Sequence, residues 1–493
     1  MSLLLKAGMV LLHNERDEVV PTRADVLIEG NRITRIESCI KPTIDCQVIE
    51  CSDKIVSPGF VDTHHHVWQS PFKGIFGDMA LLPYLAITHA SGLAFTDRDM
   101  FWANLSGNME AIDAGTTTTL DHAHMNWSNT HSRAAIAGTI SSGIRSIFAY
   151  TPVSRVLATR PEVQFASEAL PEWVMETFED LAASKALTDS QARVQLGFGW
   201  DFYFLPADVT KNVFAKARAA GAKLITSHFI RHVLDLDGES LVSKLHSADL
   251  LGSDMLLSHA GGATPEDVEL LRKANCFISA TPNTEEAMQV GPTVPFRQNL
   301  PGVNALCSLG VDCHSATSSS LVNEMRLVLQ MARGRDSEQH IRAGVRPADV
   351  SRKAAEVFNM GTIQGARAMK MERDIGSIRV GKNADIVLFD ALSPSMYCAA
   401  QQDPVLAIVL HSSIRDVDTV IVDRCIRKQH GKMLPVNVTE YEKTDFGEIG
   451  CRVGWAEVAQ HVMELQKRFV DKMDEYNLSE LESAIRKNWG LDG

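Results

Sequence analysis

Four short segments of the sequence carry histidine and aspartate side chains that could share a metal ion. His64 and His66 stand two residues apart in VDTHHHVW, and the alternation of a strand turns their side chains to the same side. The apolar runs LITSH, LLSH and LGVD end in His228, His259 and Asp312. Imidazoles with one carboxylate suit Zn²⁺ or Fe²⁺, and an open coordination position lowers the pKa of bound water toward about 7. These residue types predict metal-assisted hydrolysis.

Each of these residues also has a purely structural interpretation. A histidine triplet can be a solvated loop, a histidine at a strand end is often a core residue, and an aspartate there often caps the next helix. Because four separate apolar runs all end in ligand-type side chains, the joint pattern favours a metal site.

Strand-like runs alternate with longer helix-like stretches from Ile55 onward. Continuous apolar runs suit strands buried on both faces of a parallel sheet, and TPEDVELLRKA opens with the cap and the proline of a helix start. Eight β/α units predict a (β/α)8 barrel, an α/β fold whose catalytic groups lie at the carboxyl ends of the strands. The eight runs are IVSPGFVDTH, TTTTLDHAH, IRSIFAY, VQLGFGW, AKLITSH, DMLLSHA, CFISAT and NALCSLGVD.

The two ends of the chain differ from the middle. ADVLIEGNRITRIES near the start, and IGSIRVGKNADIVLFD and VDTVIVDRCIRKQHGK near the end, are rich in strand pattern and turns. We expect both ends to build one small β-sandwich, followed by a helical extension that packs within the subunit or across a dimer. The expected division is 1–57 and 375–440 for the β-sandwich, 58–374 for the barrel and 441–493 for the extension.

Composition excludes several classes of partner. The formal net charge of −13 over 493 residues disfavours nucleic acid and anionic membrane as partners, so a small-molecule substrate is expected. The apolar stretch LLLKAGMVLL is too short and too interrupted for a membrane span or a signal peptide. Nine cysteines without CxxC pairs are typical of a reducing compartment, which predicts a cytoplasmic protein.

Several motifs resemble the amidohydrolase superfamily, in particular its branch of cytosine deaminase-like and triazine hydrolase-like enzymes. These motifs are PGFVDTHHH, the SH pairs at 227–228 and 258–259, LGVD, GAR at 365–367 and IGSIRVGKNADIV. The resemblance covers nearly the whole chain, and the habits of similar enzymes add the expectation of a homodimer or a larger homo-oligomer.

The resemblance implies a role for each residue of the expected site. His64, His66, His228 and Asp312 would ligate the metal, while His259 would hydrogen-bond the water or the developing oxyanion. Asp312 would also accept the proton of the water. The fourth strand, VQLGFGW, lacks the lysine that a two-metal site of such families needs. One divalent ion is therefore implied, with Zn²⁺ as the first choice and Fe²⁺ as the alternative.

Further residues are candidates for the cavity wall. Gln69 matches a glutamine that faces the substrate ring in similar enzymes, and Trp68 beside it could supply an aromatic wall. Packing at the barrel rim is the alternative for both. His122 and His124 end the second strand near the same mouth, and a hydrogen-bonding role in the core is their alternative.

Two positions depart from the deaminases of this branch. Arg231 stands where those enzymes usually carry a glutamate that moves protons, and an arginine cannot act as an acid–base group near neutral pH. It could hold a substrate carboxylate or form a structural salt bridge. In SATPNTEEAMQVG, Glu285 stands where related enzymes carry an asparagine. From there it could bind a ring N–H or an amine, or supply the missing proton relay.

These observations predict a metal-dependent hydrolase that uses activated water on a non-peptide C–N bond, in an amide, a cyclic amide or a substituted heterocycle. The first alternative is an aminohydrolase of an amino-heterocycle with Glu285 as substitute proton shuttle. The second alternative is a non-catalytic scaffold of the same fold, against which the complete ligand set argues.

Overall fold

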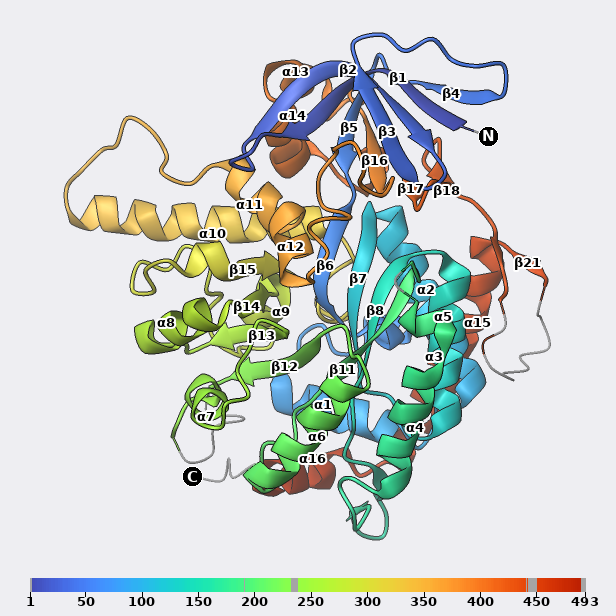
Figure 1. The fold of residues 1–493 in the computed structure, drawn as a ribbon. Helices are drawn as coiled ribbons and strands as arrows, with labels where there is room; N and C mark the ends of the chain where they lie inside the picture. The colour runs from blue at the N-terminus through green and yellow to red at the C-terminus, as the bar shows by residue number, and fades with distance from the viewer. Residues whose placement is uncertain (1, 190, 232–237, 440, 442–449, 489–493) are drawn as a thin grey trace.

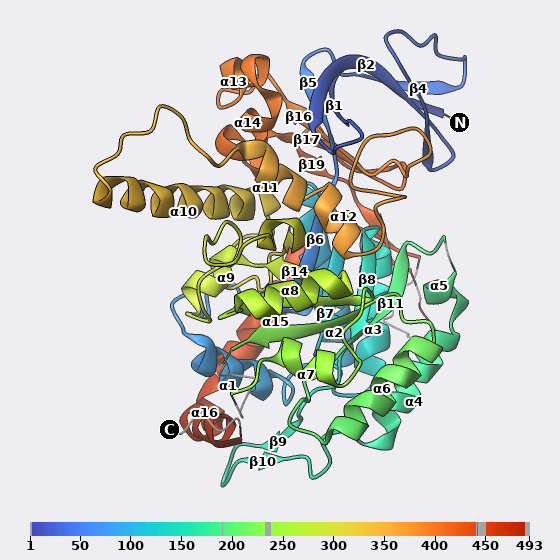
Figure 2. The same cartoon turned by 60° about the vertical axis from the view of Figure 1, so that its left-hand side comes forward.

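Eight parallel strands form the central sheet of the computed structural model, which describes residues 2–189, 191–231, 238–439, 441 and 450–488 (Figure 1). All eight strands predicted from the sequence are present, in sequence order around the sheet. Helices follow most of these strands and cover the outside of the sheet (Figure 2). The (β/α)8 barrel is thereby confirmed. Its strands are β6 (Phe60–His65), β7 (Thr116–Ala123), β8 (Arg145–Tyr150), β11 (Val194–Gly199), β12 (Ile225–Ile230), β13 (Met255–Gly261), β14 (Phe277–Ala280) and β15 (Cys307–Leu309).

The barrel closes through the residues that follow β15, and we call this junction the closing seam. The Asp312 N–H donates to the His64 carbonyl at 2.8 Å, and the His66 N–H donates to the Asp312 carbonyl at 2.8 Å. Gly310 makes this approach feasible, because a Cβ there would lie 2.7 Å from the His64 carbonyl oxygen. The first and last strands of the barrel therefore meet at candidate metal ligands.

One helix around the barrel, α8, begins at the local sequence signal that predicts it. α8 has the predicted Thr264 cap and Pro265 start, with a reciprocal hydrogen bond from Asp267. A long helix, α10, follows the closing seam and was not predicted. The helices of this region are α1 (Leu81–Ser91), α2 (Asp97–Asp113), α3 (Asn129–Ser142), α4 (Glu172–Ala183), α5 (Lys185–Thr188), α6 (Ala207–Ala219), α7 (Leu241–Ser247), α8 (Pro265–Ala274), α9 (Pro282–Ala287), α10 (Leu321–Arg342), α11 (Ala354–Met360) and α12 (Ile363–Ala368).

A second sheet of nine strands unites the two chain ends, as predicted. β5 is its link between them, since it pairs parallel with β1 and antiparallel with β16. The predicted hairpin joins β2 to β3 through Gly30, whose φ of 60° suits glycine. The strands are β1 (Ser2–His13), β2 (Val19–Glu29), β3 (Arg32–Glu37), β4 (Cys46–Glu50), β5 (Lys54–Pro58), β16 (Ile386–Asp390), β17 (Val417–Val422), β18 (Cys425–Gln429) and β19 (Lys432–Met433).

A buried ion cluster joins the barrel to the chain-end sheet. Arg145, at the start of β8, donates to Asp385 at 2.8 Å and to Asp423 at 3.0 Å. We expect Arg145→Met to lower the free energy of unfolding by about 3–5 kcal/mol, because two carboxylates would lose their buried partner. Urea unfolding of the variant beside Arg272→Met, an exposed arginine, measures the difference. Equal midpoints would contradict this expectation.

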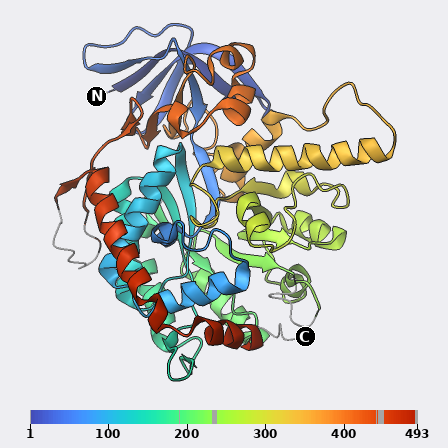
Figure 3. The ribbon, with the colours of Figure 1, turned by 180° about the vertical axis from the view of Figure 1, so that it is seen from behind.

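The predicted helical extension packs within the subunit (Figure 3). α15 (Trp455–Lys472) lies along α2, and its Phe469 ring contacts the rings of Phe72 and Phe95 at centroid distances of 5.2 and 5.8 Å. α16 (Leu478–Asn488) packs against α1. Among the described residues, every helix is too short or too polar to span a bilayer.

Candidate metal centre and its cavity

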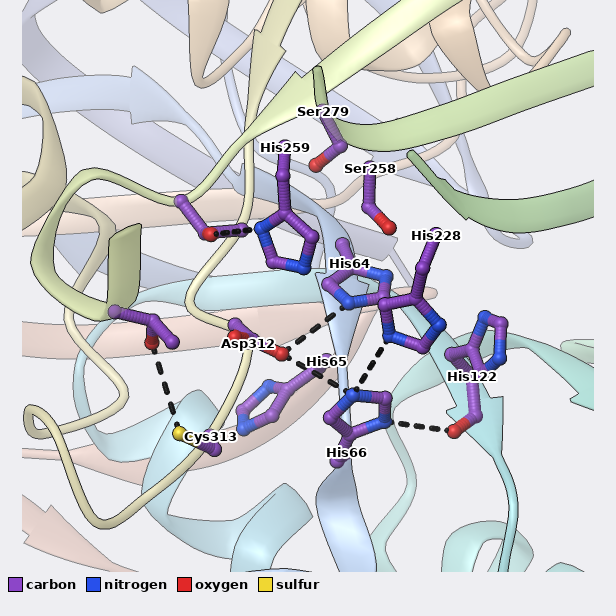
Figure 4. A network of polar contacts seen from close by, with 12 residues as sticks. His64, His65, His66, His122, His228, Ser258, His259, Ser279, Asp312 and Cys313 are labelled. Carbon is purple, nitrogen blue, oxygen red and sulfur yellow. Dashed lines mark hydrogen bonds and ion pairs between the residues drawn. The ribbon is translucent and has the colours of Figure 1, made fainter. Parts of the chain in front are cut away.

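The barrel brings the predicted ligands together at the carboxyl ends of its strands (Figure 4). Asp312 Oδ1 lies 3.2 Å from His64 Nε2 and 3.1 Å from His66 Nε2. His228 Nε2 lies 3.3 Å from His66 Nε2. The ring of His259 stands 5.3 Å from that of His64, measured between centroids. All five residues are buried or nearly so.

The hydrogen bonds around these rings leave lone pairs facing each other. His66 Nδ1 donates to the His122 carbonyl at 2.9 Å, and His228 Nδ1 donates to Asp201 Oδ2 at 2.8 Å. In their neutral forms both rings therefore have a bare Nε2. Neither ring nitrogen of His64 has a hydrogen-bond partner, although both are buried. Bare nitrogens beside a carboxylate oxygen repel one another unless a cation lies between them, so the donor set fits a divalent metal.

Burial determines the charge states of these groups. Burial lowers the pKa of His64 well below its usual value, and it also lowers the pKa of His66. Burial alone would raise the pKa of Asp312, but its close contacts with His64 and His66 outweigh burial and hold that pKa well below its ordinary value. Neutral His64 and His66 beside an ionised carboxylate are in the protonation states that bind a metal. Burial alone would lower the pKa of His228, but Asp201 raises it, and this ring must be deprotonated at Nε2 to act as a ligand.

His259 and Asp312 both adopt left-handed backbone conformations, with φ of 73° and 68°. Such conformations cost on the order of 1–3 kcal/mol outside glycine and are common where a side chain must be aimed at a reaction centre. His259 Nδ1 lies 2.9 Å from Thr281 Oγ1 and 3.7 Å from Glu285 Oε1. Thr281 and Glu285 therefore contact the Nδ1 side of the ring, and His259 is one of the residues that line the cavity.

Asp201 is a site residue that the sequence reasoning missed. It follows β11, and its carboxylate accepts from His228 Nδ1, from the His228 backbone N–H at 2.9 Å, from His122 Nε2 at 3.0 Å and from Ser227 Oγ at 3.2 Å. His122 therefore acts through Asp201 and is not among the residues that line the cavity. The signal was available, because a carboxylate ends the run VQLGFGWD at the level of the other strand ends.

We expect Asp201→Asn to weaken metal binding by roughly 10–100-fold, because carboxylates that orient a ligating histidine commonly contribute that much. The carboxylate fixes both the ring orientation and the tautomer of His228. Competition with a chelator measures the affinity. Asp254→Asn, at a carboxylate that pairs with Arg218 outside the barrel mouth, is the matched control. Equal affinities in the two variants would contradict this role of Asp201.

The metal centre opens into a cavity with mainly aromatic and apolar walls. Trp68 lines it, as predicted for an aromatic wall, and so do Asp201, His124 and Asn488 of α16. Gln69 does not line the cavity. Its Nε2 donates instead to the hydroxyl of Tyr84, which does. The other residues of the wall are Leu81, Tyr84, Leu85, Thr88, His89, Met125, Trp127, Thr151, Pro152, Val153, Ser154, Phe202, Tyr203, Phe204, Ile230, Thr284, Met288 and Val290.

Arg231 and Glu285, the two departures from the deaminase pattern, lie outside the wall of the cavity. β12 ends at Ile230, and the Arg231 guanidinium lies 4.0 Å from the carboxylate of Asp267. Glu285 is buried behind His259, where Oε1 accepts from the Thr281 backbone N–H at 2.8 Å. The structure thus brings neither side chain into contact with the space that a substrate would occupy.

A buried polar chain lies behind the ligands and was also missed. His65 Nδ1 lies 2.8 Å from Asp62 Oδ2, and His65 Nε2 lies 3.0 Å from His314 Nε2. The other ring nitrogen of His314, Nδ1, lies 2.9 Å from the Glu110 carboxylate. Asp62 Oδ1 accepts from the Val311 N–H at 3.1 Å. The middle histidine of the triplet therefore supports the closing seam instead of the metal.

Comparison with known proteins agrees with this geometry. Residues 55–434 match the model of the amidohydrolase family. A 5-methylthioadenosine/S-adenosylhomocysteine deaminase of Thermococcus kodakarensis is 28% identical over 434 residues, which cover 86% of this chain and 93% of the relative. A 5'-deoxyadenosine deaminase of Methanocaldococcus jannaschii is 25% identical, with 86% of this chain and 95% of the relative covered.

Solved structures share the fold over nearly the whole chain. An adenosine deaminase from Xanthomonas campestris with bound zinc superposes with a TM-score of 0.74 at 17% identity, covering 95% of this chain and 98% of that chain. A triazine hydrolase from Arthrobacter aurescens gives a TM-score of 0.74 at 16% identity, covering 94% and 99%. The chain belongs to the amidohydrolase family, whose members use a divalent metal, and it is a hydrolase that acts on carbon–nitrogen bonds. The scaffold hypothesis has no support among these relatives.

Proposed function

We propose that this amidohydrolase uses water and one zinc ion, held by His64, His66, His228 and Asp312, to hydrolyse a C–N bond in an amide, a cyclic amide or a substituted heterocycle. The observation that carries the proposal is the convergence of bare imidazole nitrogens and one carboxylate oxygen within 3.1–3.3 Å contacts. A divalent cation among these groups supplies Lewis acidity, which makes water nucleophilic near neutral pH.

The side chains around the proposed ion have different roles in the reaction. Asp312 is ionised and buried beside the reacting centre, so it accepts the proton of the attacking water and passes it to the departing nitrogen. His259, fixed by Thr281, stabilises the oxygen on which negative charge develops. Asp201 holds the ring of His228, and the aromatic walls exclude bulk water from the reaction.

Two features favour amide-type hydrolysis over deamination of a ring. Amide hydrolysis needs one proton moved from water to the leaving nitrogen, which Asp312 alone supplies. Ring deamination also needs a proton on the ring, and the position that carries a glutamate in similar deaminases holds Arg231, which lies beside Asp267 and outside the cavity wall. Asp201 is an unsuitable substitute, because its carboxylate already accepts four hydrogen bonds.

Deamination of an amino-heterocycle is the second candidate, because the relatives named above are deaminases of adenosine-type compounds. In that case Glu285 would act through His259, which lies 3.7 Å from it, and not on the substrate directly. Replacement of Glu285 by glutamine then separates the two functions, since only the deaminase needs the relay.

A panel of amino-heterocycles, cyclic amides and N-acyl compounds, incubated with the zinc-loaded enzyme and read by mass spectrometry, tests the proposal. Asp312→Asn serves as the blank. Addition of water, or cleavage into two products, supports amide-type hydrolysis. Exchange of NH2 for OH supports the deaminase instead. A zinc content far below one ion per chain would contradict the metal assignment.

We further propose a cytoplasmic homodimer or larger homo-oligomer. All nine cysteines are free thiols, which agrees with a reducing compartment. The outer side of α15 exposes Trp455, Met463 and Val470, and this apolar surface supports an interface between subunits. Light scattering of the wild-type protein and of Met463→Glu measures the oligomeric state, and a monomeric wild type would contradict the assembly.

A further inference from the structure

The chemical character of the cavity restricts the charge of its substrate. Six aromatic side chains are among the described residues that line it, whereas none of those residues is a lysine, an arginine or a glutamate. Two carboxylates, Asp201 and Asp312, are part of the wall. An anionic substrate would therefore meet negative charge without a cationic partner, apart from the metal itself. The aromatic residues are Trp68, Tyr84, Trp127, Phe202, Tyr203 and Phe204.

One polar group of this wall has its proton position fixed by a neighbour. Trp68 Nε1 donates to His124 Nδ1 at 3.0 Å. An indole N–H can only donate, so His124 Nδ1 must carry a lone pair, and the neutral ring then carries its proton on Nε2. Trp68 is itself held in place by ring contacts with Phe72 and Phe95 at centroid distances of 5.4 and 5.8 Å. The tautomer of His124 is thus set by a rigid donor.

The ring of His124 lies beside the metal centre. It stacks on the ring of His66, with centroids 4.0 Å apart and planes inclined by 25°. His124 lines the cavity, and within the described chain no protein acceptor is recorded for its Nε2. A fixed N–H donor without a protein acceptor, at the wall of a cavity and next to a candidate ligand, suits a hydrogen bond to a bound molecule.

We propose that His124 is a substrate-binding residue, which donates its Nε2–H to a ring nitrogen or carbonyl oxygen of an uncharged aromatic substrate. Trp68 is the positioning residue that keeps His124 in the donor tautomer, and the aromatic walls bind the rings. This inference rests on the proposed function, because it names the substrate class of the same site. It selects for a hydrogen-bond acceptor and against a negative charge.

Benzimidazole and indole provide a matched pair of probes, because they share shape and one N–H and differ in one ring nitrogen acceptor. Both are uncharged at mildly alkaline pH. Ligand-observed NMR titration of the zinc-loaded enzyme gives their dissociation constants without turnover. We expect benzimidazole to bind roughly 3- to 10-fold more tightly than indole, which is the range that one net hydrogen bond provides.

The variants separate the role of His124 from other effects. His124→Phe keeps an aromatic ring against His66 and should abolish the preference for benzimidazole, while His124→Gln, which retains an N–H donor, should restore part of it. Trp68→Phe should reduce the preference, because the tautomer is no longer fixed. His89→Phe is the matched control, since His89 also lines the cavity but contacts the Leu85 carbonyl through Nδ1. Metal content is measured in every variant.

Two outcomes would overturn the proposal. If benzimidazole keeps its advantage in His124→Phe, its nitrogen is bound by another group, such as the metal. If neither probe binds the wild type even in the millimolar range, the cavity does not accept uncharged bicyclic aromatics. Neither outcome affects the proposed hydrolysis, which is measured by product formation. An enzyme that forms no product from any compound but keeps the benzimidazole preference would contradict the proposed function alone.

Discussion

His64→Ala is expected to purify without stoichiometric metal and to lose at least about three orders of magnitude in turnover, since metal-assisted activation of water contributes several kcal/mol to such reactions. The reason is geometric. Both nitrogens of His64 are buried without a hydrogen-bond partner, and the close polar contact of the ring is with Asp312, itself a proposed ligand. Elemental analysis and a turnover assay on one preparation measure both effects.

His430→Ala is the matched control for this variant, because the side chain of His430 is 81% exposed on the chain-end sheet. We expect it to retain full metal content and activity. If His64→Ala also retained one ion per chain, the ion would be bound elsewhere, and the ligand set proposed here would be wrong.

Asp312→Asn is expected to reduce kcat by roughly 10²–10⁴-fold, the contribution typical of a general acid–base group. The asparagine keeps an oxygen that can face the ion, and His64, His66 and His228 stay in place, so the loss of turnover should exceed the loss of metal. The amide cannot accept the proton of water. Steady-state kinetics on metal-reconstituted protein, with metal content measured in parallel, separates the two effects.

Asp374→Asn provides the comparison for Asp312→Asn, because Asp374 is a half-exposed carboxylate that pairs with Arg32 far from the cavity. It should behave as the wild type. An Asp312→Asn variant that turns over at the normal rate would refute the proton-transfer role given to this residue.

The barrel was predictable because its eight strands are buried on both faces, which makes each one a continuous apolar run with a clear end. The long helix α10 was missed for the opposite reason. Its 22 residues lack one consistently apolar face, since only its first half is buried and the rest projects into solvent. The C-terminal helix α15 was found because Val458, Leu465 and Phe469 repeat at helical spacing.

The direction of a side chain follows from the sequence pattern within a strand, whereas the pattern gave no such direction for Arg231 and Glu285. His64 and His228 lie within strands, where alternation determines the direction of the side chain. Arg231 follows the last residue of β12, so strand alternation no longer determines the direction of its side chain. Glu285 lies on the short helix α9, and one residue of helical rotation brings Thr284 to the cavity and turns Glu285 toward Thr281.

The tautomer of His124 was beyond any sequence argument. It depends on a contact between Trp68, in the turn after β6, and a side chain at the end of β7, 56 residues later. The spacing of residues in the sequence does not indicate this contact, because Trp68 and His124 are each equally compatible with ordinary packing in the barrel. The same holds for Asp201, whose four hydrogen bonds come from two different strands.

The closing seam also links the order of folding to the ion. The Asp62–Val311 hydrogen bond joins segments 249 residues apart. Closing so long a loop costs conformational entropy, and the contacts at the closing seam must offset that cost. The proposed metal ligands stand on both sides of this junction, with His64 and His66 on one side and Asp312 on the other. Loss of a bound ion would therefore loosen this junction, and hydrogen exchange at the backbone amides of His66 and Asp312 would report its opening.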